Sequence, residues 1–284
     1  NRLSLFAKLL ASKGPARAVL GFSTISISVF LSQKRTLCSV VNDGGMERPK
    51  VYQYLICPFC NRVKSYMDFV GIEYDTIEVN PLTKSEINFP VTTKKVPIVI
   101  LDGKTFEDSS VIIEAITKYS EAKQLKSFPG KSFFPADTEK WNEWSEKRLA
   151  VMLYPNITRS FEESWECFAY SANVGTWSAL QRVIVRTIGP AAMSLANGRI
   201  KKKYGIVDER KELKAVLAEW CDALKGQKFL HGDKPTMPDV LVFGVLKSIQ
   251  GLRTFEEIMQ ETPVLKIWYD NVDSCAPSRV VRKM

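Results

Sequence analysis

The feature that most constrains the fold is the sequence Cys-Pro-Phe-Cys at residues 57–60. It directly follows a run of alternating β-branched, aromatic and polar residues at 50–55, and it opens an amphipathic stretch that continues to about residue 70. The pattern predicts a strand, a tight turn and a helix. Pro58 suits the first helical turn, because its missing N–H would be unpaired there and its φ is already helical.

The stretch that follows the first helix predicts a thioredoxin-like domain over residues 46–126. Strands are expected at 73–79, 96–101 and 104–107, and helices at 81–88 and 109–121. The Asp-Gly pair at 102–103 predicts the turn of a hairpin between the last two strands. The resulting order, βαβ-α-ββα, places the domain in the α/β class with a thioredoxin fold.

The position of Cys57 predicts an activated thiol. As the N-cap of the helix it would face free N–H groups and the positive end of the helix dipole, which can lower a thiol pKa from about 8.5 toward 7 or below. Arg62 and Lys64 would help only if they face the turn. Cys60, one helical turn later, is expected to be buried beside Cys57 and able to resolve a disulfide. The alternative is that the two cysteines merely pack near the start of a helix. A zinc site is not indicated, because the sequence has no second pair of ligands at short spacing.

Two further segments are expected to face the cysteine turn. Val96 and Pro97 open the third strand, and in this fold the peptide bond between them would be cis, which leaves the Val96 backbone free to pair with an extended peptide. An ordinary trans proline at a strand start is the alternative. Asp108, Ser109 and Ser110 open the next helix, as a cap and an anion pocket. Together these segments predict a site for a small peptide with a free carboxylate and amine.

The rest of the chain predicts an all-helical second domain. Residues 127–136, rich in Pro, Gly, Ser and Phe, form the expected linker, and residues 137–284 the helical domain. Apolar residues recur at helical spacing over 213–224, and a capping box at 236–239 precedes another apolar stretch. Residues 160–207 are less periodic, and the basic run at 199–203 is interpreted as a solvated helix end. His231, the one histidine, lies in a Gly/Lys/Pro loop and is assigned no role.

Charge and cysteine usage limit the cellular context. The net charge is +9, but six basic residues and no acid precede Asp43, so the remainder of the chain shows no general nucleic-acid footprint. Residues 1–45 have the composition of a transit peptide, which predicts an organelle, most simply the mitochondrion, with a plastid as the alternative. Residues 18–31 could instead associate with a membrane as an anchor. Six scattered cysteines favour a reducing compartment over a disulfide scaffold.

These motifs resemble the glutathione transferase superfamily, and more narrowly the family of membrane-associated prostaglandin E synthase type 2. The resemblance extends from about residue 50 to about residue 270. The segments that carry it are Tyr-Gln-Tyr at 52–54 before the cysteine turn, Val-Asn-Pro at 79–81, Lys-Val-Pro-Ile at 95–98, Asp-Ser-Ser-Val-Ile-Ile at 108–113, Lys-Pro at 234–235, Asp239 and Gly-Val-Leu at 244–246.

The resemblance implies a glutathione-binding enzyme that isomerises the endoperoxide of prostaglandin H to prostaglandin E, and that can bind haem with the glutathione thiolate as iron ligand. Cys57 falls on the family's catalytic cysteine and Tyr54 on the tyrosine beside it, with Cys60 as the second thiol. The glutathione contacts fall on Val96, Pro97, Asp108 and Ser109. A homodimer formed through the helical domain is also implied.

Three functions remain open from the sequence. The first is the glutathione-dependent isomerase. The second is a glutaredoxin-like thiol–disulfide oxidoreductase that uses Cys57 and Cys60. The third is a glutathione- and haem-binding module, or a membrane-peripheral scaffold, without turnover. The expected partners are glutathione and a small lipid peroxide or disulfide, and no metal ion held by the chain is expected.

Overall fold

The computed structural model describes residues 47–125, 128–275 and 282–283. Residues 45–284 form one compact unit. The predicted transit peptide, and within it the candidate anchor at 18–31, lies outside the described residues. In the part of the chain that is described, no helix combines the length and the apolar character that a membrane span requires.

The first domain contains a thioredoxin-type sheet, as predicted. The strands are β1 (Lys50–Gln53), β2 (Asp75–Glu78), β3 (Ile98–Leu101), β4 (Lys104–Glu107) and β5 (Arg282–Lys283). Their order is β4-β3-β1-β2-β5, in which β2 runs parallel to β1 and β3 antiparallel to it. The short β5, from the other end of the chain, pairs with β2 in parallel and was not predicted.

Two helices pack on this sheet, and a third predicted helix is absent. Helices α1 (Pro58–Phe69) and α2 (Ser109–Ala122) lie where they were expected. The helix predicted at 81–88 is wrong, because turns occupy this segment. The side-chain oxygen of Asn80 accepts the N–H groups of Leu82 and Thr83, and Lys84 takes a positive φ of 52°. These local bonds compete with a helical ladder.

The second domain is all-helical, as predicted. It consists of α3 (Thr138–Trp144), the π-helical turn η2 (Ser145–Leu149), α4 (Ala150–Ile157), α5 (Phe161–Cys167), the 3₁₀ turn η3 (Ala169–Asn173), α6 (Ala179–Tyr204), α7 (Glu209–Leu224), α8 (Met237–Lys247), α9 (Arg253–Glu261) and α10 (Pro263–Cys275). A 3₁₀ turn, η1 (Lys131–Phe133), lies in the predicted linker. Ring contacts among Trp141, Trp144, Trp220 and Trp268 lie in the helical core.

The weakly periodic region 160–207 contains the longest described helix. Helix α6 has 26 residues and ends in the basic residues Lys201, Lys202 and Lys203, which agrees with the expected helix end. Its outer side carries exposed apolar residues such as Leu180 and Leu195. An apolar residue on both sides of a helix weakens the periodic signal on which the sequence prediction depends.

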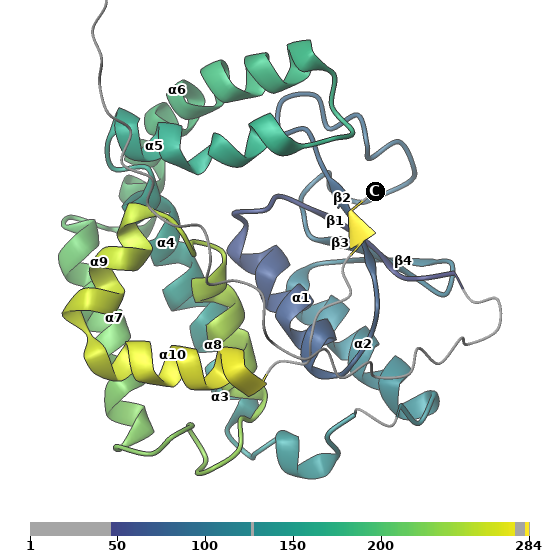
Figure 1. The fold of residues 1–284 in the computed structure, drawn as a ribbon, viewed down its shortest axis with the longest axis vertical. Coiled ribbons are helices and arrows are strands. Elements are labelled where there is room, and N and C mark those ends of the chain that lie inside the picture. The colour runs from purple at the N-terminus through teal and green to yellow at the C-terminus, as the bar shows by residue number, and fades with distance from the viewer. Residues whose placement is uncertain (1–46, 126–127, 276–281, 284) are drawn as a thin grey trace, which may run out of the picture. The chain divides into compact units, whose positions relative to one another are not determined.

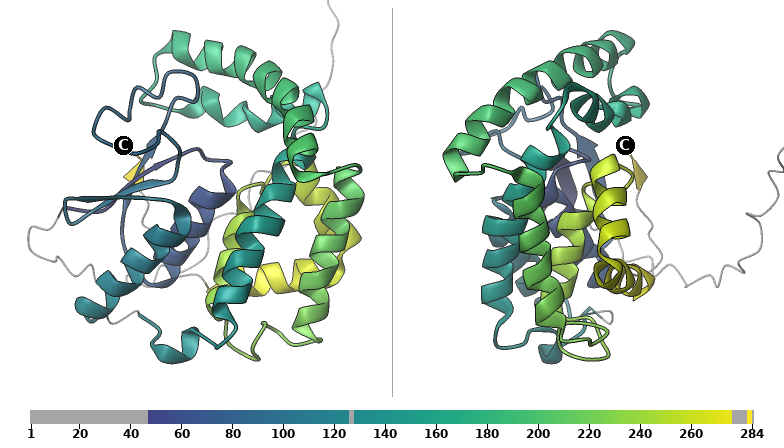
Figure 2. Two further views of the ribbon diagram at one scale, coloured as in Figure 1. Left: turned by 180° about the vertical axis from the view of Figure 1, so that it is seen from behind. Right: turned by 90° about the vertical axis from the view of Figure 1, so that its left-hand side faces the viewer.

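The two domains meet where α1 packs against α8. In Figure 1, α1 lies between the strands and α8, and Figure 2 shows the same packing from behind. The approach is close because α8 has a glycine at the crossing. A Cβ atom at Gly244 would lie 2.7 Å from the backbone oxygen of Asn61 and 2.8 Å from the Cα of Arg62. Helix α1 can therefore lie this close to α8 only because residue 244 has no side chain.

Replacement of Gly244 by alanine should lower the free energy of unfolding by about 2 kcal/mol, because overpacking would force α1 away from α8. The measurement is urea unfolding followed by circular dichroism. The matched control is Gly198→Ala on α6, where an added Cβ meets no atom within 4 Å. We expect this control to be neutral or to gain up to about 1 kcal/mol through helix propensity. Equal stability of Gly244→Ala and wild type would contradict the close approach.

Candidate active site

The turn between β1 and α1 presents Cys57 at the start of the helix. Cys57 is the N-cap of α1, with extended φ and ψ of −80° and 120°. Its N–H donates to the Tyr54 carbonyl at 3.0 Å. The side-chain amide of Asn61 donates to the carbonyls of Leu55 at 2.7 Å and Cys57 at 2.9 Å. A side chain of α1 therefore holds the backbone of the turn that precedes this helix.

The two cysteines of the turn are unequal. Both are free thiols, Cys57 half-buried and Cys60 fully buried. The pKa of Cys57 is lowered, first by a hydrogen bond from the Cys60 thiol and then by the N–H groups of Cys60 and Phe59 and the charge of Lys64, against the opposing effect of burial. Burial and the adjacent Cys57 raise the pKa of Cys60. The lowered pKa agrees with the sequence expectation, although the largest cause is the second thiol.

Tyr54 lies half-buried at the end of β1, just before the turn. Burial, followed by the nearby charges of Cys57, Cys60 and two carboxylates, raises its pKa to about 12. The hydroxyl therefore keeps its proton at neutral pH, and it can act as a hydrogen-bond donor to an oxygen that gains negative charge.

Glu78, which the sequence analysis did not single out, lies beneath the turn. It ends β2 at the position that pairs with Gln53 of β1. Its side chain accepts the Leu55 N–H at 2.8 Å and the Gln53 side-chain amide at 3.0 Å. The parallel register brings Glu78 to the turn, and only a known register could have revealed this from the sequence.

The peptide bond between Val96 and Pro97 is cis, as predicted. The antiparallel pairing of Tyr52 with Ile98 places this bond beside the end of β1. The preceding loop is held by Glu107, whose two carboxylate oxygens accept the N–H groups of Thr92 at 2.6 Å and Thr93 at 2.8 Å. These bonds lower the pKa of Glu107. No local sequence pattern marks Glu107 as the residue that anchors this loop.

The third predicted segment forms the N-terminus of α2. Asp108 is its N-cap and accepts the N–H of Ser110 at 2.9 Å and of Val111 at 3.4 Å. Ser109 is only 2% exposed, and its hydroxyl accepts a hydrogen bond from Arg62 at 3.1 Å. The predicted contact of Ser109 with glutathione would therefore have to use its backbone.

Arg62 does not face the cysteine turn. It is fully buried, and it also donates to Glu146 at 3.2 Å and to the side chain of Asn142. Burial lowers its pKa, while Glu146 acts in the opposite direction. Of the two cations considered in the sequence analysis, Lys64 is therefore the one that acts on Cys57.

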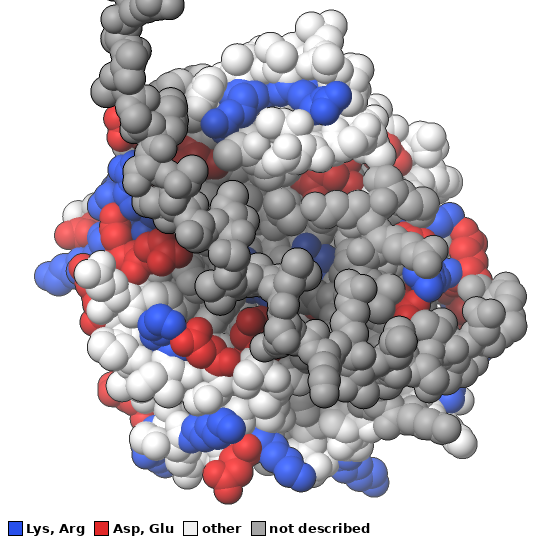
Figure 3. Space-filling view, viewed as in Figure 1, with Lys and Arg blue, Asp and Glu red and all other residues white. Residues whose placement is uncertain are grey.

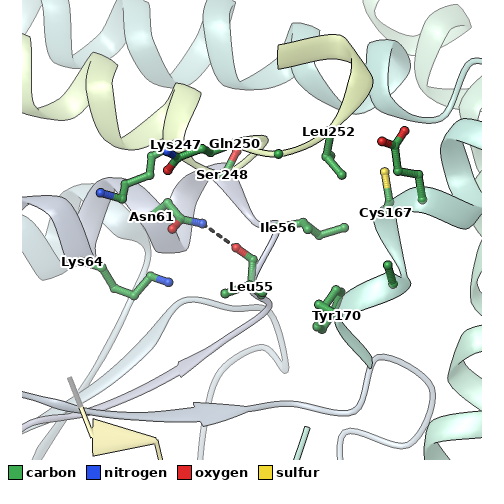
Figure 4. A pocket seen from close by; sticks show the side chains of 13 residues that line it. Leu55, Ile56, Asn61, Lys64, Cys167, Tyr170, Lys247, Ser248, Gln250 and Leu252 are labelled. Atoms are coloured by element: carbon green, nitrogen blue, oxygen red, sulfur yellow. Dashed lines mark hydrogen bonds between the residues drawn. The ribbon is translucent and has the colours of Figure 1, made fainter. Parts of the chain in front are cut away.

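A pocket of about 380 Å³ opens next to the turn, between the two domains. Leu55 and Ile56 of the turn, Asn61 and Lys64 of α1, and Tyr170 of η3 line it (Figure 4). Cys57 itself is not among the lining residues and follows Ile56 in the chain. The pocket combines apolar walls with two cations, Lys64 and Lys247, and one acid, Glu166, which suits a small amphipathic molecule.

A haem or metal site finds no support in the residues described. No group of three His, Cys, Asp or Glu side chains there could hold a metal ion. His231 is hydrogen-bonded with Thr236 through Nδ1 at 3.0 Å and with Asp137 through Nε2 at 2.9 Å, so both ring nitrogens are engaged. On the face shown in Figure 3, basic and acidic side chains are interspersed.

Comparison with known proteins gives consistent results. Residues 51–123 match the model of the glutathione S-transferase N-terminal domain, and residues 183–274 match that of the C-terminal domain. Prostaglandin E synthase 2 of Danio rerio is 30% identical over 78% of this chain and 69% of its own, and that of Mus musculus is 29% identical over 77% and 68%. The structure of a glutathione S-transferase I bound with lactoylglutathione covers 81% of this chain and 99% of its own, with a TM-score of 0.50 at 15% identity.

Proposed function

Because the chain belongs to the glutathione transferase superfamily, we propose that it is a glutathione-dependent isomerase of the prostaglandin E synthase type 2 kind, which converts the endoperoxide of prostaglandin H to the keto-alcohol of prostaglandin E. The observation that carries the proposal is the Cys57 thiol, with a lowered pKa, at the N-cap of α1, in a turn that follows the strand end beside the cis Val96-Pro97 bond. The similarity to two prostaglandin E synthases supports the choice of reaction.

Glutathione would be held by the segments that converge on the turn. The Val96 backbone would pair with the extended tripeptide, and the exposed Asp108 would receive its amine. When bound, glutathione would supply a second thiol. Lactoylglutathione on a related fold supports glutathione as the ligand class.

The residues of the chain account for a balanced reaction. Attack of the Cys57 thiolate on one peroxide oxygen forms an S–O bond and breaks the O–O bond, which leaves an alkoxide on the other oxygen. The Tyr54 hydroxyl, protonated at neutral pH, donates a hydrogen bond to this alkoxide. The carbon attached to the sulfur-bound oxygen then loses its proton, which forms the ketone, breaks the S–O bond and releases the thiolate. The alkoxide takes up a proton. The product is an isomer of the substrate.

A thiol–disulfide oxidoreductase is the second candidate. The observation that favours it is the buried Cys60 thiol, which donates a hydrogen bond to Cys57. A thiol in this position could attack a mixed disulfide on Cys57 and release the reduced product.

The test compares the full chain with Cys57→Ser and Cys60→Ala in two assays, isomerisation of prostaglandin H with glutathione and reduction of a glutathione mixed disulfide. We expect Cys57→Ser to lose about 100-fold or more of the isomerase rate, because the nucleophile is lost. Cys60→Ala should keep isomerase activity, and its Cys57 alkylation midpoint should move to higher pH because the hydrogen bond from Cys60 is lost.

The outcomes separate the two candidates. Product formation by wild type that does not exceed the spontaneous decay of prostaglandin H rules out the isomerase. Disulfide reduction that requires both cysteines, without isomerisation, supports the oxidoreductase instead.

A further inference from the structure

Glu78 connects three segments that form the thiol site and its pocket. Its carboxylate accepts the Leu55 N–H of the turn and the Gln53 amide of β1, and the nearby Tyr170 hydroxyl of η3 lowers the pKa of this carboxyl. Its own backbone oxygen accepts the indole N–H of Trp177 at 3.3 Å, from the segment between η3 and α6. Leu55 and Tyr170 both line the pocket. Glu78 therefore joins the turn of the first domain, through its carboxylate, to a segment of the second, through its backbone oxygen.

Gln53, the partner of Glu78 on β1, can form a hydrogen bond with either the ionised or the protonated carboxyl group of Glu78. Gln53 is buried, and its Nε2 donates to Glu78 while its Oε1 has no hydrogen-bond partner within the described ranges. If Glu78 gains a proton, rotation of the Gln53 amide by half a turn would let the new O–H donate to Oε1. The neutral acid would then keep one hydrogen bond with Gln53, and the buried Oε1 would gain a partner in exchange for the bond that Nε2 now donates.

The charged and titratable groups around Glu78 and the neighbouring Tyr54 come from four segments. Tyr54 lies at the end of β1, Cys57, Cys60 and Lys64 belong to the turn and α1, Glu86 follows β2, and Tyr170 belongs to η3. Lys64 stabilises the ionised form of both Glu78 and Cys57. Burial raises the pKa of Glu78 to about 7, against the opposing hydrogen bonds and Lys64.

We propose that Glu78 is a positioning residue with an exchangeable proton, which competes with the Cys57 thiolate for Lys64 and so makes the reactivity of Cys57 depend on whether Glu78 is ionised. With Glu78 ionised, two anions share one cation and the thiolate is less favoured. With Glu78 protonated, this competing negative charge is absent and the thiolate is more favoured. The inference rests on the proposed function only in taking Cys57 as the reacting group, because it concerns the free protein.

The test is the rate of alkylation of Cys57 by iodoacetamide against pH, in the full chain, with the Cys57 peptide followed by mass spectrometry. We expect the wild-type profile to show a second inflection near pH 7, where Glu78 titrates. Glu78→Gln should remove this inflection and move the thiol midpoint to lower pH by a few tenths of a unit, because a nearby negative charge is lost. Glu86→Gln, which removes another acid near Tyr54, should keep the inflection.

The role of Lys64 is tested by a double-mutant cycle on the same midpoint. Lys64→Met should raise the thiol midpoint, and Glu78→Gln should have a smaller effect in the Lys64→Met background than in wild type. Tyr170→Phe should move the Glu78 inflection to higher pH, because the hydroxyl that lowers the pKa of Glu78 is lost. If Glu78 only supported the fold, its substitution would change the alkylation rates, but its effect on the thiol midpoint would be the same with and without Lys64.

Titration of Glu78 can also be followed directly in the wild-type protein, which avoids any effect of a substitution on folding. The ¹³C resonance of the Glu78 carboxyl in the wild-type protein should titrate near pH 7. A carboxyl midpoint of about 4–5, the range of an ordinary glutamate, would overturn the proposal, as would an inflection that persists in Glu78→Gln. No substrate is used, so these outcomes are independent of whether the protein isomerises an endoperoxide.

Discussion

Replacement of Asp239 by alanine should lower the free energy of unfolding by about 4 kcal/mol, the largest effect that we expect from one substitution in the second domain. Asp239 lies in the first turn of α8 and is fully buried. Its Oδ1 accepts the Leu230 N–H at 3.0 Å and the Trp268 indole N–H at 2.9 Å. Its Oδ2 accepts the N–H of Thr236 at 2.9 Å and its hydroxyl at 2.8 Å. Alanine would leave these donors without their acceptor.

The measurement is the urea unfolding midpoint, followed by circular dichroism, for wild type and two variants of Asp239. Asp239→Asn should cost less than Asp239→Ala, because the remaining side-chain oxygen can still accept two of the bonds. Asp233→Ala is the matched control, since Asp233 is an exposed acid in the neighbouring loop and should change stability by less than about 0.5 kcal/mol. An Asp239→Ala variant as stable as this control would disprove the role of the carboxylate in holding α8.

The second large effect is expected at Arg62, whose replacement by methionine should cost about 3 kcal/mol. The guanidinium joins α1 to the N-terminus of α2 through Ser109 and to the second domain through Asn142 and Glu146. Methionine fills part of the volume but leaves these polar groups without their donor. Because Ser109 follows the cap residue Asp108, we also expect weaker glutathione binding, seen as a rise in KM for glutathione.

The control for Arg62 is a second arginine ion pair that lies on the surface. Arg148 and Glu219 are each about half exposed, and Arg148→Met should cost no more than about 1 kcal/mol. Thermal and urea unfolding of both variants give the comparison. A cost at Arg62 no greater than at Arg148 would show that the buried guanidinium adds nothing beyond a surface pair. Replacing both Arg62 and Glu146 should cost less than the sum of the single changes, since the two side chains interact.

The parts of the fold that depend on neighbouring residues were predictable from the sequence. The strand–turn–helix arrangement around Cys57 follows from local patterning, and the hairpin at 102–103 follows from turn chemistry. The cis bond at Pro97 was expected from the position of a proline at a strand start in this fold. For the turn and the hairpin the physical cause lies within a few residues, whereas the cis bond was expected only from the thioredoxin fold that these elements predict.

The parts of the site that depend on register and packing were not predictable. Glu78 reaches the turn because β2 pairs with β1 in parallel, and no residue near Glu78 in the chain indicates this. Arg62 looks like a surface cation in the sequence, yet it is buried because acceptors from α2, α3 and η2 converge on it. Such interactions join residues far apart in the chain, and burial of a charge is decided by them.

The packing of α8 has a consequence for how the protein loses its structure. Met237, Val240 and Leu241, from the second domain, belong to the same apolar cluster as Val63 and Ile112 of the first. The core beneath the thioredoxin-type sheet is therefore completed by a segment that follows α2 by more than 100 residues. Separation of α1 from α8 would expose the apolar cores of both domains to solvent at the same time. The boundary visible in the sequence is thus no boundary for cooperative unfolding, and amide protons on its two sides should exchange with solvent through the same opening.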